Sequence, residues 1–452
     1  MQFEPAGCHL MRRAALAATL RASTDAGQAP WGLAKNSSNL FRDRRGGARQ
    51  RLDLSAFCHV LELEPAQGWI DVEGMMTYEA LVDQLLPQGV MPAVVPQLRS
   101  ITVGGAISGC GIEATSHQEG LVHHGMLELD VMLSSGQVVC CTADNQHSDL
   151  FHGFPGSYGT LGYALRVRLR TLPVKPFVKV EHLPFDMPSA FFQELGRHCQ
   201  KETPFVDGVV FGQSQQIINI ASFVDQAPWV SDYSYEHIYY RSLPVNRIDF
   251  MRTQDYLWRW DTDWFWCSKN IYAQHPLVRR LLGRKRLNSR TYQRIMRWNS
   301  RWGLTKRVAR LLGRYPESVI QDVDIPMANA PVFLEFLLKE IGIVPIWICP
   351  VQAKDAARQF TLFPMKAGAL YLNFGFWDVV QSSTLHEPGH FNRLVEKEVM
   401  RLDGIKSLYS DSFFTPEEFA RLYNMTAYQA LKNKYDPGGR LLGLYDKCVL
   451  RA

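Results

Sequence analysis

The feature that most constrains the fold is a glycine-rich stretch, TVGGAISGCGIEATSHQEG, at residues 102–120. Gly109, Gly111 and Ala114 match the dinucleotide-binding pattern G-x-G-x-x-A, which requires a long crossover helix directly after the glycines. The following segment instead carries two more glycines and no amphipathic pattern, and the next predicted strand begins near Met126. The match is therefore interpreted as accidental, and a Rossmann fold is not expected. The closely spaced glycines still allow backbone N–H groups to converge on a phosphate.

The residues around this stretch predict mostly strands. Alternating apolar residues predict strands over 60–65, 69–74, 91–96 and 163–174, and residues 126–142 read as strand, Ser-Ser-Gly turn and strand. Residues 77–89 have helical spacing, with Thr77 as a plausible N-cap. From Pro176 onward, strands are expected over 204–211, 217–224, 235–244, 345–352, 361–365 and 369–377, and helices near 332–342, 392–403, 416–423 and 427–434. The whole pattern predicts an α+β protein with two domains, residues 1–175 and 176–452.

Cysteine usage and hydropathy indicate the compartment. The 452 residues include nine cysteines, an odd number without a C-x-x-C pair, which is typical of reduced thiols in a cytoplasmic protein. No apolar run approaches the roughly 18–20 residues that span a bilayer. Residues 9–23 have a short apolar core between arginines, so they predict a surface helix rather than a signal peptide.

A basic stretch over residues 279–314 carries thirteen Lys or Arg, and no acidic residue lies between Asp263 and Glu317. Three interpretations are open: a solvated helical face, a nucleic-acid site, and contact with an anionic membrane surface. Tryptophans and paired leucines accompany the arginines, which favours the membrane. We therefore expect peripheral membrane association and no nucleic-acid partner.

Two motifs taken together, T-V-G-G-x-I-x-G-x-G-I-E-x-x-S-H and S-x-G-T-L-G at residues 157–162, carry a specific resemblance. They resemble the FAD-binding domain of the vanillyl-alcohol-oxidase, or PCMH-type, flavoproteins. Within that superfamily the chain looks most like the delta-24-sterol reductase family, since PFVDGVVF, PIWICP, ALYLNFG, GIKSLYSDSFFTPEEF and LYDKC also have counterparts there. The resemblance covers nearly the whole chain from about residue 30.

The resemblance implies a PCMH-type domain of two small α+β subdomains, followed by an α+β substrate or cap domain with an antiparallel sheet and C-terminal helices that close on the flavin. It implies FAD as cofactor. The implied cofactor-binding residues are Asn36, Ser37, Ser38, Thr102, Val103, Gly104, Gly105, Ile107, Ser108, Gly109, Gly111, Ile112, Glu113, Ser116, His117, Leu121, Gly159, Thr160, Leu161 and Gly162. Residues 33–44 contain no histidine for a covalent flavin link, so non-covalent FAD is expected.

Flavin chemistry at a carbon–carbon bond moves a hydride through flavin N5 and needs a protein group to carry a proton. The candidates are Tyr409, which matches a family tyrosine, Asp411, and Lys432, which resembles a C-terminal lysine of the superfamily. Each also has an ordinary interpretation: a satisfied core tyrosine, a turn-forming aspartate and a solvated helix lysine. His123 and His124 are adjacent, which on a strand would point them apart, and no metal site is expected.

These observations predict an FAD-dependent oxidoreductase that reduces or dehydrogenates a carbon–carbon bond in a membrane lipid. The aromatic run over 256–266 offers wall material for a large apolar substrate. The leading interpretation is a sterol side-chain reductase with NADPH as a transient electron donor. The alternatives are a flavoprotein acting on methyl- or methylene-branched fatty acyl chains of phospholipids, and a flavin-bearing membrane scaffold without turnover.

Overall fold

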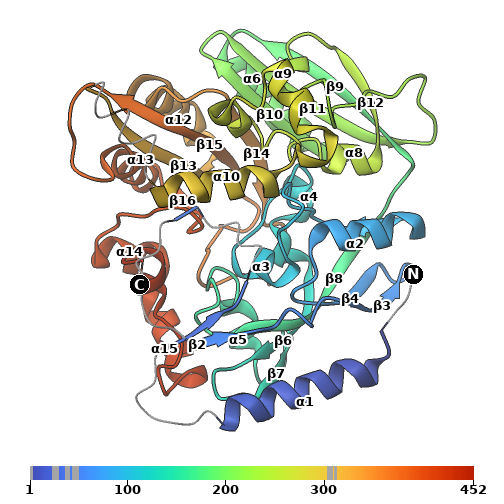
Figure 1. Cartoon of the computed structure of the whole chain (residues 1–452), viewed down its shortest axis with the longest axis vertical. Helices are drawn as coiled ribbons and strands as arrows, with labels where there is room; N and C mark the ends of the chain where they lie inside the picture. The colour runs from blue at the N-terminus through green and yellow to red at the C-terminus, as the bar shows by residue number, and fades with distance from the viewer. Residues whose placement is uncertain are drawn as a thin grey trace.

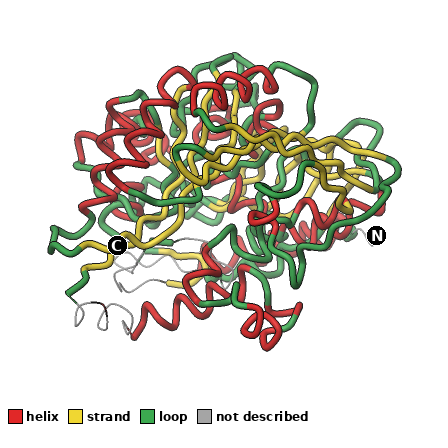
Figure 2. The backbone as a smooth tube through the Cα atoms, turned by 90° about the horizontal axis from the view of Figure 1, so that it is seen from above, coloured by secondary structure: helices red, strands yellow, loops and turns green. Residues whose placement is uncertain are grey.

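The computed structural model describes residues 4–22, 30–35, 41–42, 50–302, 309 and 313–451. Two antiparallel sheets dominate these residues, a six-stranded sheet near the N-terminus and an eight-stranded sheet formed by residues 177–406 (Figure 1). Helices cover both sheets, as the view from above shows (Figure 2). The predicted α+β class is confirmed.

The six-stranded sheet is built around one long strand, β8. Its order is β3-β4-β8-β6-β7, with β5 also paired to β8. The strands are β3 (Val60–Glu64), β4 (Trp69–Glu73), β5 (Val90–Pro92), β6 (Met126–Met132), β7 (Val138–Cys141) and β8 (Tyr163–Pro173). Strict alternation along β8 places Val167 and Leu169 in the core and puts Arg166 and Arg168 on the other face, where both form ion pairs with Asp71.

Short helices fill the connections of this part of the chain. They are α1 (Ala6–Ala22), α2 (Tyr78–Leu85), α3 (Val103–Ser108), α4 (Ser116–Glu119) and α5 (Ser148–Gly153). Thr77 caps α2 as predicted, since its side chain accepts a hydrogen bond from the Ala80 N–H. The helix after the glycine stretch, α4, has only four residues, and every strand pair in this sheet is antiparallel. The Rossmann fold is thereby excluded.

The eight-stranded sheet has the order β12-β9-β11-β10-β14-β15-β13-β16. Its strands are β9 (Phe177–Phe185), β10 (Phe205–Gly212), β11 (Gln215–Val224), β12 (Ile248–Arg252), β13 (Tyr315–Pro326), β14 (Ile346–Gln352), β15 (Leu370–Ser382) and β16 (Ile405–Lys406). Three helices, α6 (Pro188–Cys199), α12 (Ala330–Phe336) and α13 (His390–Arg401), share an apolar core with one face. Alternation sends Ile346 and Ile348 into that core and Trp347 and Cys349 to the opposite face.

The remaining elements surround the opposite face. They are the parallel pair β1 (Trp31–Leu33) and β2 (Gln50–Leu52), and helices α7 (Tyr239–Ser242), α8 (Thr253–Leu257), α9 (Pro276–Leu282), α10 (Ser289–Trp302), α14 (Pro416–Leu422), α15 (Met425–Tyr435) and α16 (Leu444–Cys448). The C-terminal α15 packs against α5, so the end of the chain returns to the six-stranded sheet (Figure 1). Two predicted strands are wrong: residues 235–244 contain α7, and 361–365 form no strand.

Candidate cofactor and substrate site

One cavity of about 730 Å³ lies between the two sheets. Its wall combines α3 and the turn at residues 158–164 with single side chains from β13, β14 and β15. This volume lies within the range of cofactor and ligand pockets. The predicted cofactor residues that line it are Thr102, Gly104, Gly105, Ser108, Gly109, Gly111, Ile112, Gly159 and Gly162.

The glycine stretch forms the short helix α3 rather than a loop. Thr102 caps this helix, because its Oγ1 accepts from the Gly105 N–H at 3.3 Å. Gly104 permits α3 to lie against β4 and β8, since a Cβ there would come within 3.0 Å of the Gly74 oxygen and of the Ala164 Cβ. Gly162 has a φ of +147°, and a Cβ would meet Val131 at 2.5 Å. Close backbone packing therefore accounts for these two glycines.

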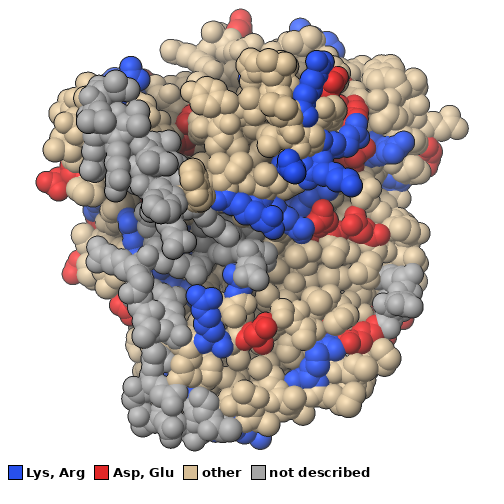
Figure 3. All heavy atoms as spheres, viewed as in Figure 1, with Lys and Arg blue, Asp and Glu red and all other residues tan. Residues whose placement is uncertain are grey.

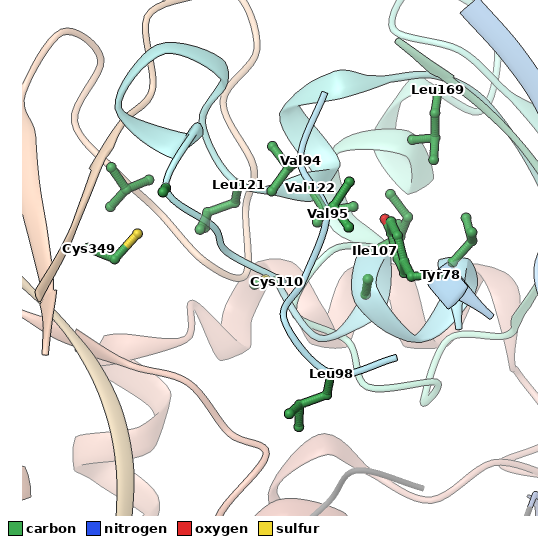
Figure 4. Close-up of a cluster of buried hydrophobic side chains, with 14 of the residues drawn as sticks. Tyr78, Val94, Val95, Leu98, Ile107, Cys110, Leu121, Val122, Leu169 and Cys349 are labelled. Atoms are coloured by element: carbon green, nitrogen blue, oxygen red, sulfur yellow. The ribbon is translucent and has the colours of Figure 1, made fainter. Parts of the chain in front are cut away.

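Four predicted cofactor residues face the apolar core. Val103, Ile107, Leu121 and Leu161 are at most 1% exposed, and none of them lines the cavity. Ile107 lies beside Tyr78, and Leu121 beside Val122, in the cluster under α3 (Figure 4). These apolar residues hold the wall in place from behind.

Glu113, Ser116, His117 and Thr160 also lie behind the wall, in hydrogen bonds of their own. Glu113 accepts from Arg259 at 3.0 Å, and burial raises the pKa of Glu113 to about 7. The Ser116 hydroxyl accepts from the Glu113 N–H, and the Thr160 hydroxyl donates to the Ser157 oxygen. The two ring nitrogens of His117 form hydrogen bonds with the carbonyl oxygens of Ala114 and Thr203, so His117 links the glycine-rich segment to the segment that precedes β10. Asn36, Ser37 and Ser38 lie outside the described residues.

Three cations line the cavity: Lys35, Arg42 and Arg51. No carboxylate among the described residues forms an ion pair with them. Burial away from bulk water lowers the pKa of Lys35 to about 8. Arg42 is 6% exposed; its Nη1 donates to the Leu408 carbonyl and to the Cys448 Sγ, whereas its Nη2 has no hydrogen-bond partner in the described part of the chain. Because a buried cation without an anionic partner is unfavourable, these side chains suit the pyrophosphate of FAD.

A second part of the wall, called the aromatic end below, consists of aromatic side chains. Trp264 stacks on Phe41 with ring centroids 5.2 Å apart, and Phe265 lies 4.2 Å from Trp377. Trp347 completes this wall. The aromatic run predicted as wall material therefore contributes two side chains to the cavity, whereas Trp258, Trp260 and Trp266 lie in the core.

Backbone strain is concentrated at the same cavity. Cys110, Tyr158, Trp264 and Phe265 are non-glycine residues with φ between 47° and 59°, and all four line the cavity. Such conformations are costly and persist where the surrounding structure enforces them, typically at functional sites. The strain therefore supports this cavity as the site of function.

Tyr409 lies at the aromatic end, where its hydroxyl accepts from the Trp377 Nε1 at 2.7 Å. A hydrogen bond connects it with Asp322, and burial, together with the Asp322 carboxyl, raises the pKa of Tyr409 well above its ordinary value. Burial likewise raises the pKa of Asp322 far above the range of ordinary aspartates. Sequence reasoning missed Asp322; its signal was the pair of carboxylates in VIQDVDIP, two residues apart on a buried strand.

Lys432 and Asp411 do not line the cavity. Lys432 forms an ion pair with Asp436 at 2.6 Å and donates to the carbonyls of Thr160 and Leu441. The Asp411 Oδ1 lies 3.5 Å from the Arg451 Nε. Lys432 thus connects α15 to the turn that carries Gly159 and Gly162.

Among the described residues, one group has ligand atoms close enough for a metal ion: Glu4, His59 and Glu73. The Arg12 guanidinium already bridges Glu4 and Glu73. The prediction that the side chains of His123 and His124 point apart on a strand was wrong: both residues lie on a 3₁₀ turn, Val122–Gly125, and their rings stack with centroids 4.5 Å apart.

Several cations of the basic stretch form ion pairs with acidic residues of the same chain. Arg279 is buried and bonded to Asp263, while Arg284 and Arg290 pair with Asp232 and Glu79. The Lys and Arg side chains over α9 and α10 accordingly alternate with acidic ones (Figure 3). Residues 303–308 and 310–312 of the stretch lie outside the described residues. No described helix combines the length and the apolar character that crossing a bilayer requires.

Comparison with known proteins identifies the cofactor. A family model described as an FAD binding domain matches residues 12–142. The chain is 26% identical to the Delta(24)-sterol reductase of Homo sapiens over 416 residues, which cover 86% of this chain and 75% of the relative. It is 22% identical to the Delta(24)-sterol reductase of Arabidopsis thaliana over 92% of this chain and 79% of that protein.

A more distant relative matches only the N-terminal part. Cytokinin dehydrogenase 5 of Arabidopsis thaliana is 26% identical over 152 residues, which cover 33% of this chain and 28% of the relative. The predicted cofactor, FAD, is confirmed by the matching domain.

Proposed function

The chain carries an FAD-binding domain of the PCMH type and is an FAD-dependent oxidoreductase of carbon–carbon bonds, and we propose that its substrate is a double bond in a sterol-like membrane lipid. The names of the reductases that match most of the chain support a sterol. In this proposal, residues 1–175 hold the cofactor and residues 176–452 supply most of the substrate wall.

The observation that carries the proposal is one cavity whose wall combines cationic and aromatic side chains. Lys35 and Arg42 suit a pyrophosphate, and the aromatic end, with Trp264 and Phe265, suits a large apolar ring system. When bound, FAD supplies hydride transfer at its N5. The protein contributes orientation, a dry wall and a proton-carrying group.

Tyr409 and Asp322 supply the polar groups at the aromatic end, and we propose that proton transfer takes place there. Trp377 and Phe265 lie beside them in the wall. We assign Lys432 a supporting role, since its ammonium is held by Asp436 and by two carbonyls.

The test uses purified protein under anaerobic conditions. Acid treatment should release free FAD; flavin that stays on the polypeptide would contradict non-covalent binding. The protein is then reduced with NADPH or with dithionite and mixed with a Δ24-sterol or with a phospholipid that carries a methylene-branched acyl chain. Reoxidation by the sterol alone supports the proposal, reoxidation by the phospholipid favours the acyl alternative, and no reoxidation by either favours a scaffold.

We further propose that α9 and α10 contact a membrane surface. Leu277, Leu281 and Trp298 are exposed large apolar side chains on these two helices. Lys285 and Arg286 lie between the helices in the short turn Arg284–Arg286. Apolar side chains flanked by cations suit the headgroup layer of an anionic bilayer, and a lipid substrate would be drawn from that layer.

A further inference from the structure

Asp322 presents an unpartnered carboxyl oxygen at the cavity wall. Alternation along β13 sends Val323 and Ile325 into the helix-covered core and Asp322 to the cavity face. Its Oδ1 is buried from bulk water and has no hydrogen-bond partner among the described residues. Buried carboxyl oxygens are normally bonded, so this unpartnered oxygen is an exception that calls for an explanation.

The strand opposite makes room for this carboxyl group. Gly375 is the register partner of Asp322 on β15. A Cβ at Gly375 would lie 2.8 Å from Asp322 Oδ1 and 2.3 Å from the Trp377 ring. The absence of a side chain at this position therefore leaves space beside Oδ1.

The Tyr409 hydroxyl forms a hydrogen bond with the Asp322 side chain. Tyr409 accepts from the Trp377 Nε1 and donates its own proton toward the Asp322 carboxyl. Asp324 is the other charged group that acts on Asp322, and its carboxyl accepts from Asn373 at 2.9 Å outside the cavity wall. No cation in the described residues pairs with Asp322.

These surroundings decide which group gives up a proton more readily. Burial and the nearby Asp324 raise the pKa of Asp322 well above its ordinary value, which favours the protonated carboxyl group. The pKa of Tyr409 is raised above an ordinary value that already lies near 10. A neutral carboxylic acid is the stronger acid of the two, and the Tyr409 hydroxyl stabilises the carboxylate that remains after transfer.

We propose that Asp322 is the proton donor to the substrate carbon, with Tyr409 as its positioning partner; this deepens the proposed function and rests on it. When reduced FAD supplies a hydride to one carbon of the double bond, a C–H bond would form there and the π electron pair would move to the other carbon. That carbon takes the proton of the Asp322 carboxyl group, whose O–H bond breaks and leaves its electron pair on oxygen. Water then returns a proton to Asp322. One double bond gains two hydrogens, and the cofactor is oxidised by two electrons.

The test separates the two half-reactions in the FAD-loaded protein. D322N keeps the shape of the side chain but cannot act as a Brønsted acid. We expect dithionite to reduce its FAD as in the wild type, while reoxidation by a Δ24-sterol in detergent slows by about 100-fold or more, the usual contribution of a general acid. The matched control is D378N: Asp378 on β15 pairs with Lys269 and does not line the cavity, so this variant should reoxidise at close to the wild-type rate.

A second test uses the pH dependence of the reoxidation rate. The wild-type reoxidation rate should fall as the pH rises through the pKa of Asp322, because the donor loses its proton. Y409F removes a hydrogen bond that favours the carboxylate, so it should move this fall to higher pH while the reaction persists. This measurement needs no Asp322 variant, so it decides the matter even where D322N does not fold.

Three outcomes count against these ideas in different ways. A wild-type protein that no sterol or acyl lipid reoxidises overturns the proposed function, and the proton donor with it. A normal wild-type reaction with an unaffected D322N overturns the proton donor alone. Loss of reoxidation in Y409F at every pH assigns the proton to Tyr409 instead.

Discussion

Lys35 donates a hydrogen bond from its Nζ to the Thr102 Oγ1 at 2.8 Å and thereby joins the N-terminal segment to the cap of α3. The same Oγ1 accepts from the Gly105 N–H. One cation and one helix cap therefore meet at the part of the cavity that suits the FAD pyrophosphate.

Replacement of Lys35 by methionine should weaken FAD binding about 10- to 100-fold, since a hydrogen bond to a charged group contributes roughly 1.5–3 kcal/mol. In the wild type, affinity should also fall as the pH rises above about 8, because the free ammonium then loses its proton. Titration of the apoprotein with FAD at several pH values, followed by flavin fluorescence, measures both effects. A K35M variant with the same pH dependence as the wild type would contradict this role.

Replacement of Lys432 by methionine should destabilise the fold by about 3–5 kcal/mol, because it leaves the buried Asp436 without its cation. Thermal unfolding of the holoprotein measures this loss. The double variant K432M/D436N removes both charges and should recover part of it. Below the melting temperature, the rate of flavin reoxidation should change by only a few-fold; a loss comparable with that expected for D322N would make Lys432 catalytic after all.

His124 should make the protein sensitive to mild acid. Burial lowers the pKa of His124 to about 4, whereas an unfolded histidine titrates near 6.5, and its Nδ1 accepts from the Leu121 N–H. The unfolded chain therefore binds the proton first. Stability is complete above about pH 6.5 and falls toward pH 4, by up to about 3 kcal/mol. Burial also lowers the pKa values of His117 and His123, which add to the same loss. H124Q, which keeps an acceptor for Leu121, should therefore reduce but not abolish the fall of the melting temperature in this window, and H237Q, at an exposed position, should leave the fall unchanged.

Replacement of Leu281 by glutamate should reduce binding to anionic vesicles. Leu281 is 82% exposed on α9, beside the cations of the turn that follows. The matched control is L385E, because Leu385 is similarly exposed, at 71%, and lies outside this patch. Vesicle flotation at low and high salt compares the two variants. Equal flotation of L281E and the wild type would contradict the proposed contact.

The predicted elements were most reliable where local pattern and burial agree. The strict alternation of residues 163–174 and the Thr77 cap both predicted their elements correctly, since each depends on residues close in sequence. Residues 235–244 were predicted as a strand, but they contain the helical turn α7, from which the side chains of Tyr239 and Tyr240 are buried. Tertiary packing overrode local preference there.

The sequence by itself determined the cofactor through its resemblance to the PCMH-type flavoproteins, and it determined the α+β class through strand alternation, which is a local signal. It also identified the glycines of α3 and Tyr409 as candidates. Only the tertiary structure brought Asp322 beside Tyr409, 87 residues later in the chain, and left Lys35 and Arg42 without carboxylate partners among the described residues. Only the fold, too, paired Arg279 with Asp263 and took it out of the basic surface. Such relationships depend on which strands and loops lie opposite each other across a cavity. Residue spacing along the chain does not reveal contacts between segments that are far apart in sequence.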